Sequence, residues 1–160
     1  MKIKSRHHLK GSDARKIIAK IEPFLEDPSS LRQSSLDMAV SDEGVALIFI
    51  EGRPLLMLVE DQPFFTVLGA IEMMPYKRLV VVDSGAVRFV VNGADIMKPG
   101  IVSADPEIAV GDLVVIVEER HNKPLAIGRA LVAGTEMKGE GKAVKSLHHV
   151  GDVIWKGLEE

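Results

Sequence analysis

The chain has 160 residues, a formal charge of −3 and 46% hydrophobic residues, values typical of one globular domain or of two small ones. It contains no cysteine, which excludes disulfide bonds, thiol catalysis and thiolate metal sites. No apolar run approaches the roughly 20 residues of a membrane helix, and no apolar segment follows the basic N-terminal residues as in a secretory signal, so we expect a cytoplasmic protein.

The first twenty residues form a basic stretch in an otherwise acidic chain. Only Asp13 opposes the cations there, which are Lys2, Lys4, Arg6, Lys10, Arg15, Lys16 and Lys20. A solvated tail and helix face would explain this stretch, and so would a local phosphate-binding surface. The negative total charge argues against nucleic-acid binding through bulk charge alone, so any phosphate contact has to be local.

An amphipathic helix is predicted within this stretch. Its apolar residues recur at helical spacing and are Ala14, Ile17, Ile18, Ile21 and Leu25. Ser12 or Gly11 is expected to cap its N-terminus, and Pro23 is expected to disturb its last turn. The opposite, basic face carries Arg15, Lys16 and Lys20.

Short strands are expected next, over residues 36–40, 45–50 and 55–59, with turns at 42–44 and at Glu51-Gly52. Residues 64–74 fit a strand or a helix, and Gln62-Pro63 resembles a helix entry with proline in the first turn. These elements predict an N-terminal domain over residues 1–75 that combines a helix with antiparallel strands.

Residues 79–101 carry the most informative pattern. Leu79 to Val82 predict a buried strand, Ser84-Gly85 a sharp turn, and residues 86–91 a short helix that ends at Asn92-Gly93. Extended chain resumes at Ala94. Glycine and alanine leave backbone N–H groups uncovered, so a flat or anionic ligand can approach the main chain closely.

The remaining residues predict a small barrel of short strands over 113–117, 125–132 and 143–147. Together with the preceding pattern, these segments resemble a PUA domain, the RNA-binding fold named after pseudouridine synthases and archaeosine transglycosylases. Val110-Gly111-Asp112 resembles the family's Gly-Asp strand entry, residues 125–130 its next strand, and residues 148–152 with Trp155 its closing elements.

The resemblance covers about half the chain, residues 74–157. The other half resembles the α/β extension that precedes PUA in archaeal relatives of the malignant T-cell-amplified-sequence translation factors. The implied fold class is α+β, with an α/β pre-PUA domain over 1–75 followed by a PUA β-barrel over 76–160.

A non-catalytic RNA-binding surface is what the resemblance implies for function. Carried over by position, its residues are Gly85, Ala86, Arg88, Asn92, Gly93, Ala94, Asp95, Lys98, Pro99 and Gly100 on one side, and His148, His149 and Val150 on the other. Arg88 and Lys98 would contact phosphates, and His148 or His149 would stack on an unpaired base. Asp95 would either brace the loop or read a base.

Relatives often hold a single-stranded 3′ end, commonly a CCA terminus, so the implied partner is tRNA or another structured RNA in translation initiation or ribosome recycling. Arg15, Lys16 and Lys20 would add a secondary contact with RNA or with the small ribosomal subunit. The resemblance implies no cofactor and no membrane partner, and a monomer is expected. An accessory subunit that delivers RNA to a separate modifying enzyme is the alternative within the binding class.

Two catalytic or metal-binding interpretations also arise from the residues. Asp83-Ser84-Gly85 after an apolar run resembles an aspartic-protease element, which would require a homodimer in which Asp83 meets its twin. In the PUA interpretation, Asp83 instead holds the tight turn by accepting main-chain N–H groups. His7-His8 and His148-His149 predict no metal site, because adjacent side chains of a strand point to opposite faces.

Overall fold

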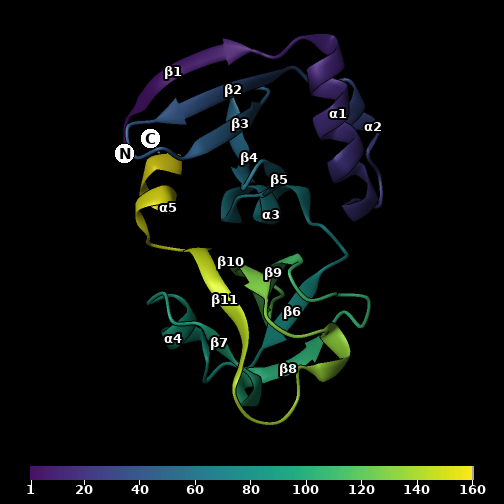
Figure 1. Cartoon of the computed structure of the whole chain (residues 1–160), viewed down its shortest axis with the longest axis vertical. Coiled ribbons are helices and arrows are strands. Elements are labelled where there is room, and N and C mark those ends of the chain that lie inside the picture. Colours follow the sequence, from purple (N-terminus) through teal and green to yellow (C-terminus); the bar gives the residue numbers. More distant parts are fainter. Residues whose placement is uncertain (160) are drawn as a thin grey trace. The chain divides into compact units, whose positions relative to one another are not determined.

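The computed structural model describes residues 1–159 and divides into two compact units. The first comprises Met1–Tyr76 together with residues 156–159, and the second comprises Lys77–Trp155. Each unit is built on its own sheet, and the predicted α+β class is confirmed (Figure 1).

The first unit contains an antiparallel sheet whose strands lie side by side in chain order. They are β1 (Ile3–His8), β2 (Leu36–Ser41), β3 (Ala46–Ile50), β4 (Arg53–Val59) and β5 (Gln62–Phe65). The predicted hairpin turn between β3 and β4 is confirmed. Glu51 and Gly52 have φ values of 49° and 80°, the left-handed backbone that a tight hairpin turn requires.

The helical elements of this unit are α1 (Gly11–Ile21), the 3₁₀ turn η1 (Glu22–Phe24), α2 (Ser29–Arg32) and α3 (Val67–Met73). Pro23 acts as predicted, since α1 gives way to η1 with proline in its first positions. The predicted side-chain cap is wrong. Lys10 occupies the cap position and no side chain caps the helix, so Ser12 lies inside α1.

Two further predictions in this unit are wrong. Residues 3–8, interpreted as part of a solvated tail, form β1 because β2 offers them a hydrogen-bonding edge. Gln62-Pro63 begins β5 and no helix, and an edge strand tolerates proline because its outer N–H has no ladder partner. The helix begins later, where the Thr66 hydroxyl accepts the Gly69 N–H at 3.0 Å.

The second unit is a nearly closed barrel with the strand order β7-β11-β10-β9-β6-β8. Its strands are β6 (Leu79–Val82), β7 (Ile96–Met97), β8 (Ile101–Ala104), β9 (Leu113–Glu118), β10 (Pro124–Ala130) and β11 (Lys142–His149). The two end strands, β7 and β8, are joined by the single 3₁₀ turn η2 (Lys98–Gly100), which keeps the open ends of the sheet close together.

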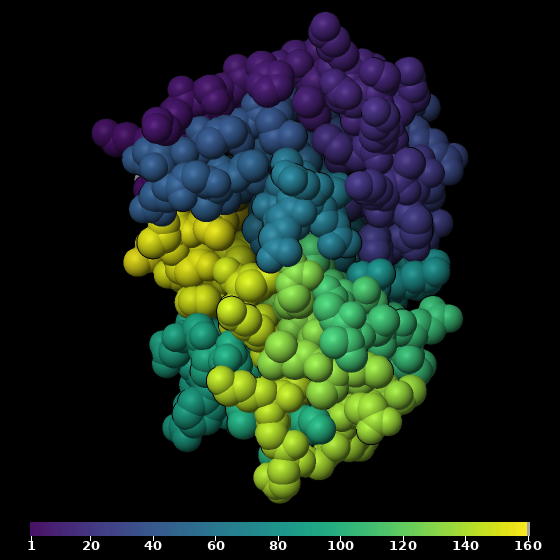
Figure 2. Space-filling view, viewed as in Figure 1, coloured from purple at the N-terminus to yellow at the C-terminus, as the bar shows by residue number. Residues whose placement is uncertain are grey.

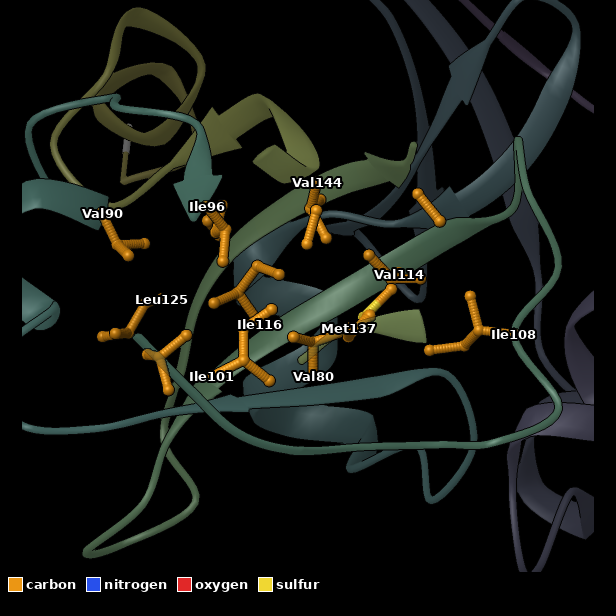
Figure 3. Packing of buried hydrophobic residues seen from close by; sticks show 14 residues of the cluster. Val80, Val90, Ile96, Ile101, Ile108, Val114, Ile116, Leu125, Met137 and Val144 are labelled. Atoms are coloured by element: carbon orange, nitrogen blue, oxygen red, sulfur yellow. The ribbon is translucent and has the colours of Figure 1, made fainter. Parts of the chain in front are cut away.

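Aliphatic side chains from around the barrel fill its interior, as Figure 3 shows. Val80, Ile116 and Val144 come from three different strands, and Met137 follows the 3₁₀ turn η3 (Gly134–Glu136). Val90 is a buried member of this core and lies in α4 (Val87–Val90), the short helix predicted after Ser84-Gly85. This anchor fixes α4 against the barrel. The remaining helix, α5 (Val153–Leu158), begins in the second unit and ends in the first.

Candidate nucleic-acid interface

The turn before α4 is held by Asp83, in the role predicted for this carboxylate. Its Oδ1 accepts the Ala86 N–H at 2.9 Å, and its own N–H donates to the Gly100 carbonyl at 2.9 Å. The first bond closes the turn and the second ties it to η2. Two segments that are distant in sequence thereby form one continuous main-chain surface.

A pocket of about 550 Å³ opens between α4, β7 and η2. Its lining includes the predicted site residues Gly85, Ala86, Ala94, Asp95, Pro99 and Gly100, and its other members are Asp83, Phe89, Val90, Ile96 and Met97. The lining is mostly apolar, and among the described residues that form it there is no lysine or arginine. The volume lies in the range of small-molecule sites and is sufficient for a nucleobase.

Asp95 braces the loop before β7, which is one of its two predicted roles. Its Oδ1 accepts the Ser146 N–H at 2.9 Å, and its Oδ2 accepts the Lys142 Nζ at 3.2 Å, so it ties the loop before β7 to β11. The Ser146 hydrogen bond, followed by that of Lys142, holds the pKa of Asp95 below its ordinary value. The carboxylate is therefore ionised at neutral pH.

The two histidines at the end of β11 point to opposite faces, as predicted for adjacent strand residues, and only one reaches the surface. His148 is fully buried, with Nδ1 3.0 Å from Asp152 Oδ2. A carboxylate can only accept, so Nδ1 carries the proton. The prediction that His148 stacks on a base is wrong, because its ring has no exposed face.

His149 lies instead against the glycine loop. Its Nδ1 donates to the Val150 carbonyl at 2.9 Å, which leaves Nε2 directed at Gly93. A Cβ at Gly93 would lie 2.9 Å from this Nε2, and the φ of Gly93 is +89°. This position therefore requires glycine both for its backbone and for the approach of the imidazole.

Asp152 fixes the geometry behind His149. Its carboxylate accepts the main-chain N–H groups of His149 at 2.9 Å and of Trp155 at 2.7 Å, in addition to its contact with His148. Burial alone would raise the pKa of Asp152, but the hydrogen bonds and the His148 imidazole outweigh burial and lower it. The end of β11 and the start of α5 are thus joined by one ionised carboxylate.

Several predicted site residues do not line the pocket. Arg88 and Asn92 are exposed, and Gly93, Lys98 and Val150 are half-buried outside the lining. The Arg88 guanidinium lies 4.8 Å from the centroid of the neighbouring Phe89 ring. These five residues stay predicted site residues that lie outside the pocket lining.

Two large side chains at the pocket were not predicted from the sequence. Phe89 is 52% exposed and Met97 is 45% exposed, and both contribute to the lining. A signal was present for Phe89, because aromatic residues make up only 4% of the chain and this one lies within the glycine-rich stretch. Its exposed ring offers the stacking surface that His148 cannot supply.

The basic face of α1 lies in the first unit and is exposed as predicted. Arg15, Lys16 and Lys20 are exposed, whereas Ile18 and Ile21 are buried. Within residues 1–159, no cluster of three or more His, Asp or Glu side chains is arranged to hold a metal ion. No helix in the same range has the length and apolar character needed to cross a membrane.

Comparisons with known proteins agree with this architecture. A family model described as PUA domain matches residues 78–151. An uncharacterised protein of Methanocaldococcus jannaschii is 40% identical over 159 residues, which cover 97% of this chain and 98% of the relative. Translation machinery-associated protein 20 of Saccharomyces cerevisiae is 30% identical, covering 96% of this chain and 92% of the yeast protein.

Solved structures show the same fold over nearly the whole chain. A hypothetical protein from Pyrococcus horikoshii, 36% identical, superimposes with a TM-score of 0.86 and covers 96% of this chain and 99% of that protein. A conserved PUA domain protein from Thermoplasma acidophilum, 25% identical, has a TM-score of 0.82 with coverages of 96% and 99%.

Proposed function

Because the chain belongs to the PUA-domain family that includes these archaeal proteins and Translation machinery-associated protein 20, we propose that it is a non-catalytic RNA-binding protein of the translation machinery. Its ligand is an RNA with an unpaired 3′ end, such as tRNA. The pocket between α4, β7 and η2 receives the unpaired end, and the protein acts in translation initiation or ribosome recycling.

The main support for this proposal is the set of residues that line the pocket. Its lining offers main-chain surface at glycines and the exposed ring of Phe89, with no lysine or arginine. Such a lining suits a base, which is flat and uncharged, better than a phosphate. We propose that Arg88 and Lys98, which adjoin the lining residues Phe89 and Pro99 in sequence, contact the phosphates that flank an inserted base. A blunt duplex keeps its terminal bases stacked and has none to insert.

Binding of a deacylated tRNA, compared with the same tRNA lacking its unpaired 3′ tail, tests the proposal. Fluorescence anisotropy should show that loss of the tail weakens binding by at least the roughly 5- to 150-fold expected for one lost stacked base, at ~1–3 kcal/mol per base. Salt should weaken binding only modestly, because few phosphates are neutralised. Equal affinity for tailed and blunt RNA would contradict the proposal.

We further propose that the basic face of α1 contacts a large RNA such as that of the small ribosomal subunit. Changing Arg15, Lys16 and Lys20 together to alanine should reduce co-sedimentation with small subunits and leave binding of a short tailed RNA intact. A triple alanine variant at the exposed Arg120, Lys123 and Lys138 removes the same charge and serves as the control. If the α1 variant instead loses tailed-RNA binding and keeps subunit association, this assignment is wrong.

A further inference from the structure

The strand β1 has an open hydrogen-bonding edge. It is the outermost strand of the first unit's sheet and pairs only with β2 among the described strands. All six of its residues are exposed. The purple atoms of this segment lie at the margin of the first unit in Figure 2, and no other element of that unit covers them on the face shown. An uncovered edge strand is a template for pairing with another chain.

The pattern of hydrogen bonds shows which groups face the open edge. Leu9 N–H donates to the Leu36 carbonyl at 2.9 Å, so Leu36 bonds toward β1. Bonding alternates along an antiparallel pair, and the register places His7 opposite Met38 and Ser5 opposite Val40. The main-chain N–H and C=O groups of Ser5 and His7 therefore hydrogen-bond to β2. The N–H and C=O groups of Arg6 and His8 point away from β2, toward the open edge.

The side chains along this edge are cationic and partly fixed. Arg6 Nε lies 2.9 Å from Asp37 Oδ2, and its guanidinium lies 4.2 Å from the centroid of the Phe49 ring. His8 Nδ1 lies 3.2 Å from Asp37 Oδ1. Arg6 and His8 still expose 42% and 68% of their side chains. No acidic residue precedes Asp13, whereas Lys2 and Lys4 also flank the edge.

We propose that the open edge of β1 binds an acidic, extended segment of a partner protein by strand addition. A peptide strand supplies both donors and acceptors, so it pairs with the N–H and the C=O of Arg6 and His8 alike. RNA phosphates can only accept and would leave these carbonyls unpaired. Lys2 and Lys4 repel the same lysines of a second copy of β1, but they attract a strand that carries carboxylates. The charge therefore makes the edge selective for an acidic strand. The edge belongs to the first unit and the pocket to the second, so this proposal goes beyond RNA binding.

Amide hydrogen exchange in the full-length, isotope-labelled protein tests the proposal with a defined probe, a short peptide of alternating Glu and Val. Saturating peptide should slow exchange of the Arg6 and His8 amides by about tenfold or more, because each gains a hydrogen-bond partner. The Ser5 and His7 amides, already bonded to β2, should change little. A fully N-methylated peptide of the same sequence keeps the charges, but its methyl groups project from the edge that would face β1 and replace its main-chain donors. A paired strand cannot form, so this peptide should not protect these amides.

A matched pair of variants isolates the main-chain contribution. His8→Pro removes the outward N–H, whereas His8→Val removes the same imidazole and keeps the N–H. Peptide affinity of His8→Pro should fall about fivefold below that of His8→Val, as expected for one lost hydrogen bond. If His8→Pro fails to keep β1 folded, the double change Lys2→Glu with Lys4→Glu provides the test. It should lower the affinity for the acidic peptide by at least the same fivefold.

Three results would overturn the proposal. The first is an absence of protection at Arg6 and His8 at millimolar peptide. The second is equal binding of the N-methylated peptide, which would mean that charge alone is responsible. The third is protection of the same amides by a single-stranded oligouridine, which would assign the edge to RNA.

Discussion

Replacing Phe89 with leucine separates stacking from stability at the proposed RNA site. The ring is 52% exposed, so about half of the ~200 Å² surface of a phenylalanine side chain is buried against the protein. Leucine keeps most of that apolar contact, and we expect the free energy of unfolding to fall by less than ~1.5 kcal/mol. Stacking of a base on an aromatic ring contributes ~1–3 kcal/mol, so the Kd for a 3′-tailed RNA should rise about 5- to 150-fold.

Fluorescence anisotropy with a labelled tailed RNA measures the affinity, and thermal unfolding of the same samples measures the stability. Phe89→Tyr keeps an aromatic face and is the matched control, which should bind nearly as well as the wild type. Wild-type affinity in Phe89→Leu, with a folded protein, would refute the assignment of this ring as the stacking surface.

Three other changes test the supports of the site. Asp83→Asn should lower the free energy of unfolding in urea by ~1–3 kcal/mol, because the turn loses a charged acceptor; an unchanged midpoint would contradict this role. Lys98→Ala should weaken tailed-RNA binding a few-fold without changing Tm, whereas Gly93→Val should weaken it more and also lower Tm, because its φ is +89°; wild-type affinity in both would place the site elsewhere. The folded-state pKa of Asp95 lies below its ordinary value, so its stabilisation is complete above about pH 4 and is lost as pH falls through the lowered pKa. The Tm advantage of wild type over Asp95→Asn should therefore shrink on acidification, and a constant difference would show that Asp95 is not ionised in the fold.

Local patterns were sufficient for much of the second unit. The apolar run at Leu79–Val82, the turn at Ser84-Gly85 and the short helix before Asn92-Gly93 all appear as predicted, because glycine and apolar runs constrain the backbone locally. The order of the motifs along the chain was sufficient to identify the family. Asp83 was predicted as a turn acceptor because a short carboxylate side chain reaches main-chain N–H groups only a few residues away.

Long-range pairing decided what these patterns left open. Residues 3–8 have no apolar alternation, so only the edge of β2 makes them a strand. Alternation requires His148 and His149 to face opposite sides, yet which one faces inward depends on how the barrel closes around β11. Phe89 joins the pocket because η2 is tied to the turn at Asp83, a contact between segments distant in sequence. The sequence by itself determined the strand, turn and short helix of residues 79–91 and the family, because backbone propensity acts over a few residues. Only the tertiary structure decided which side chains face solvent, since burial arises from contacts between strands brought together by folding.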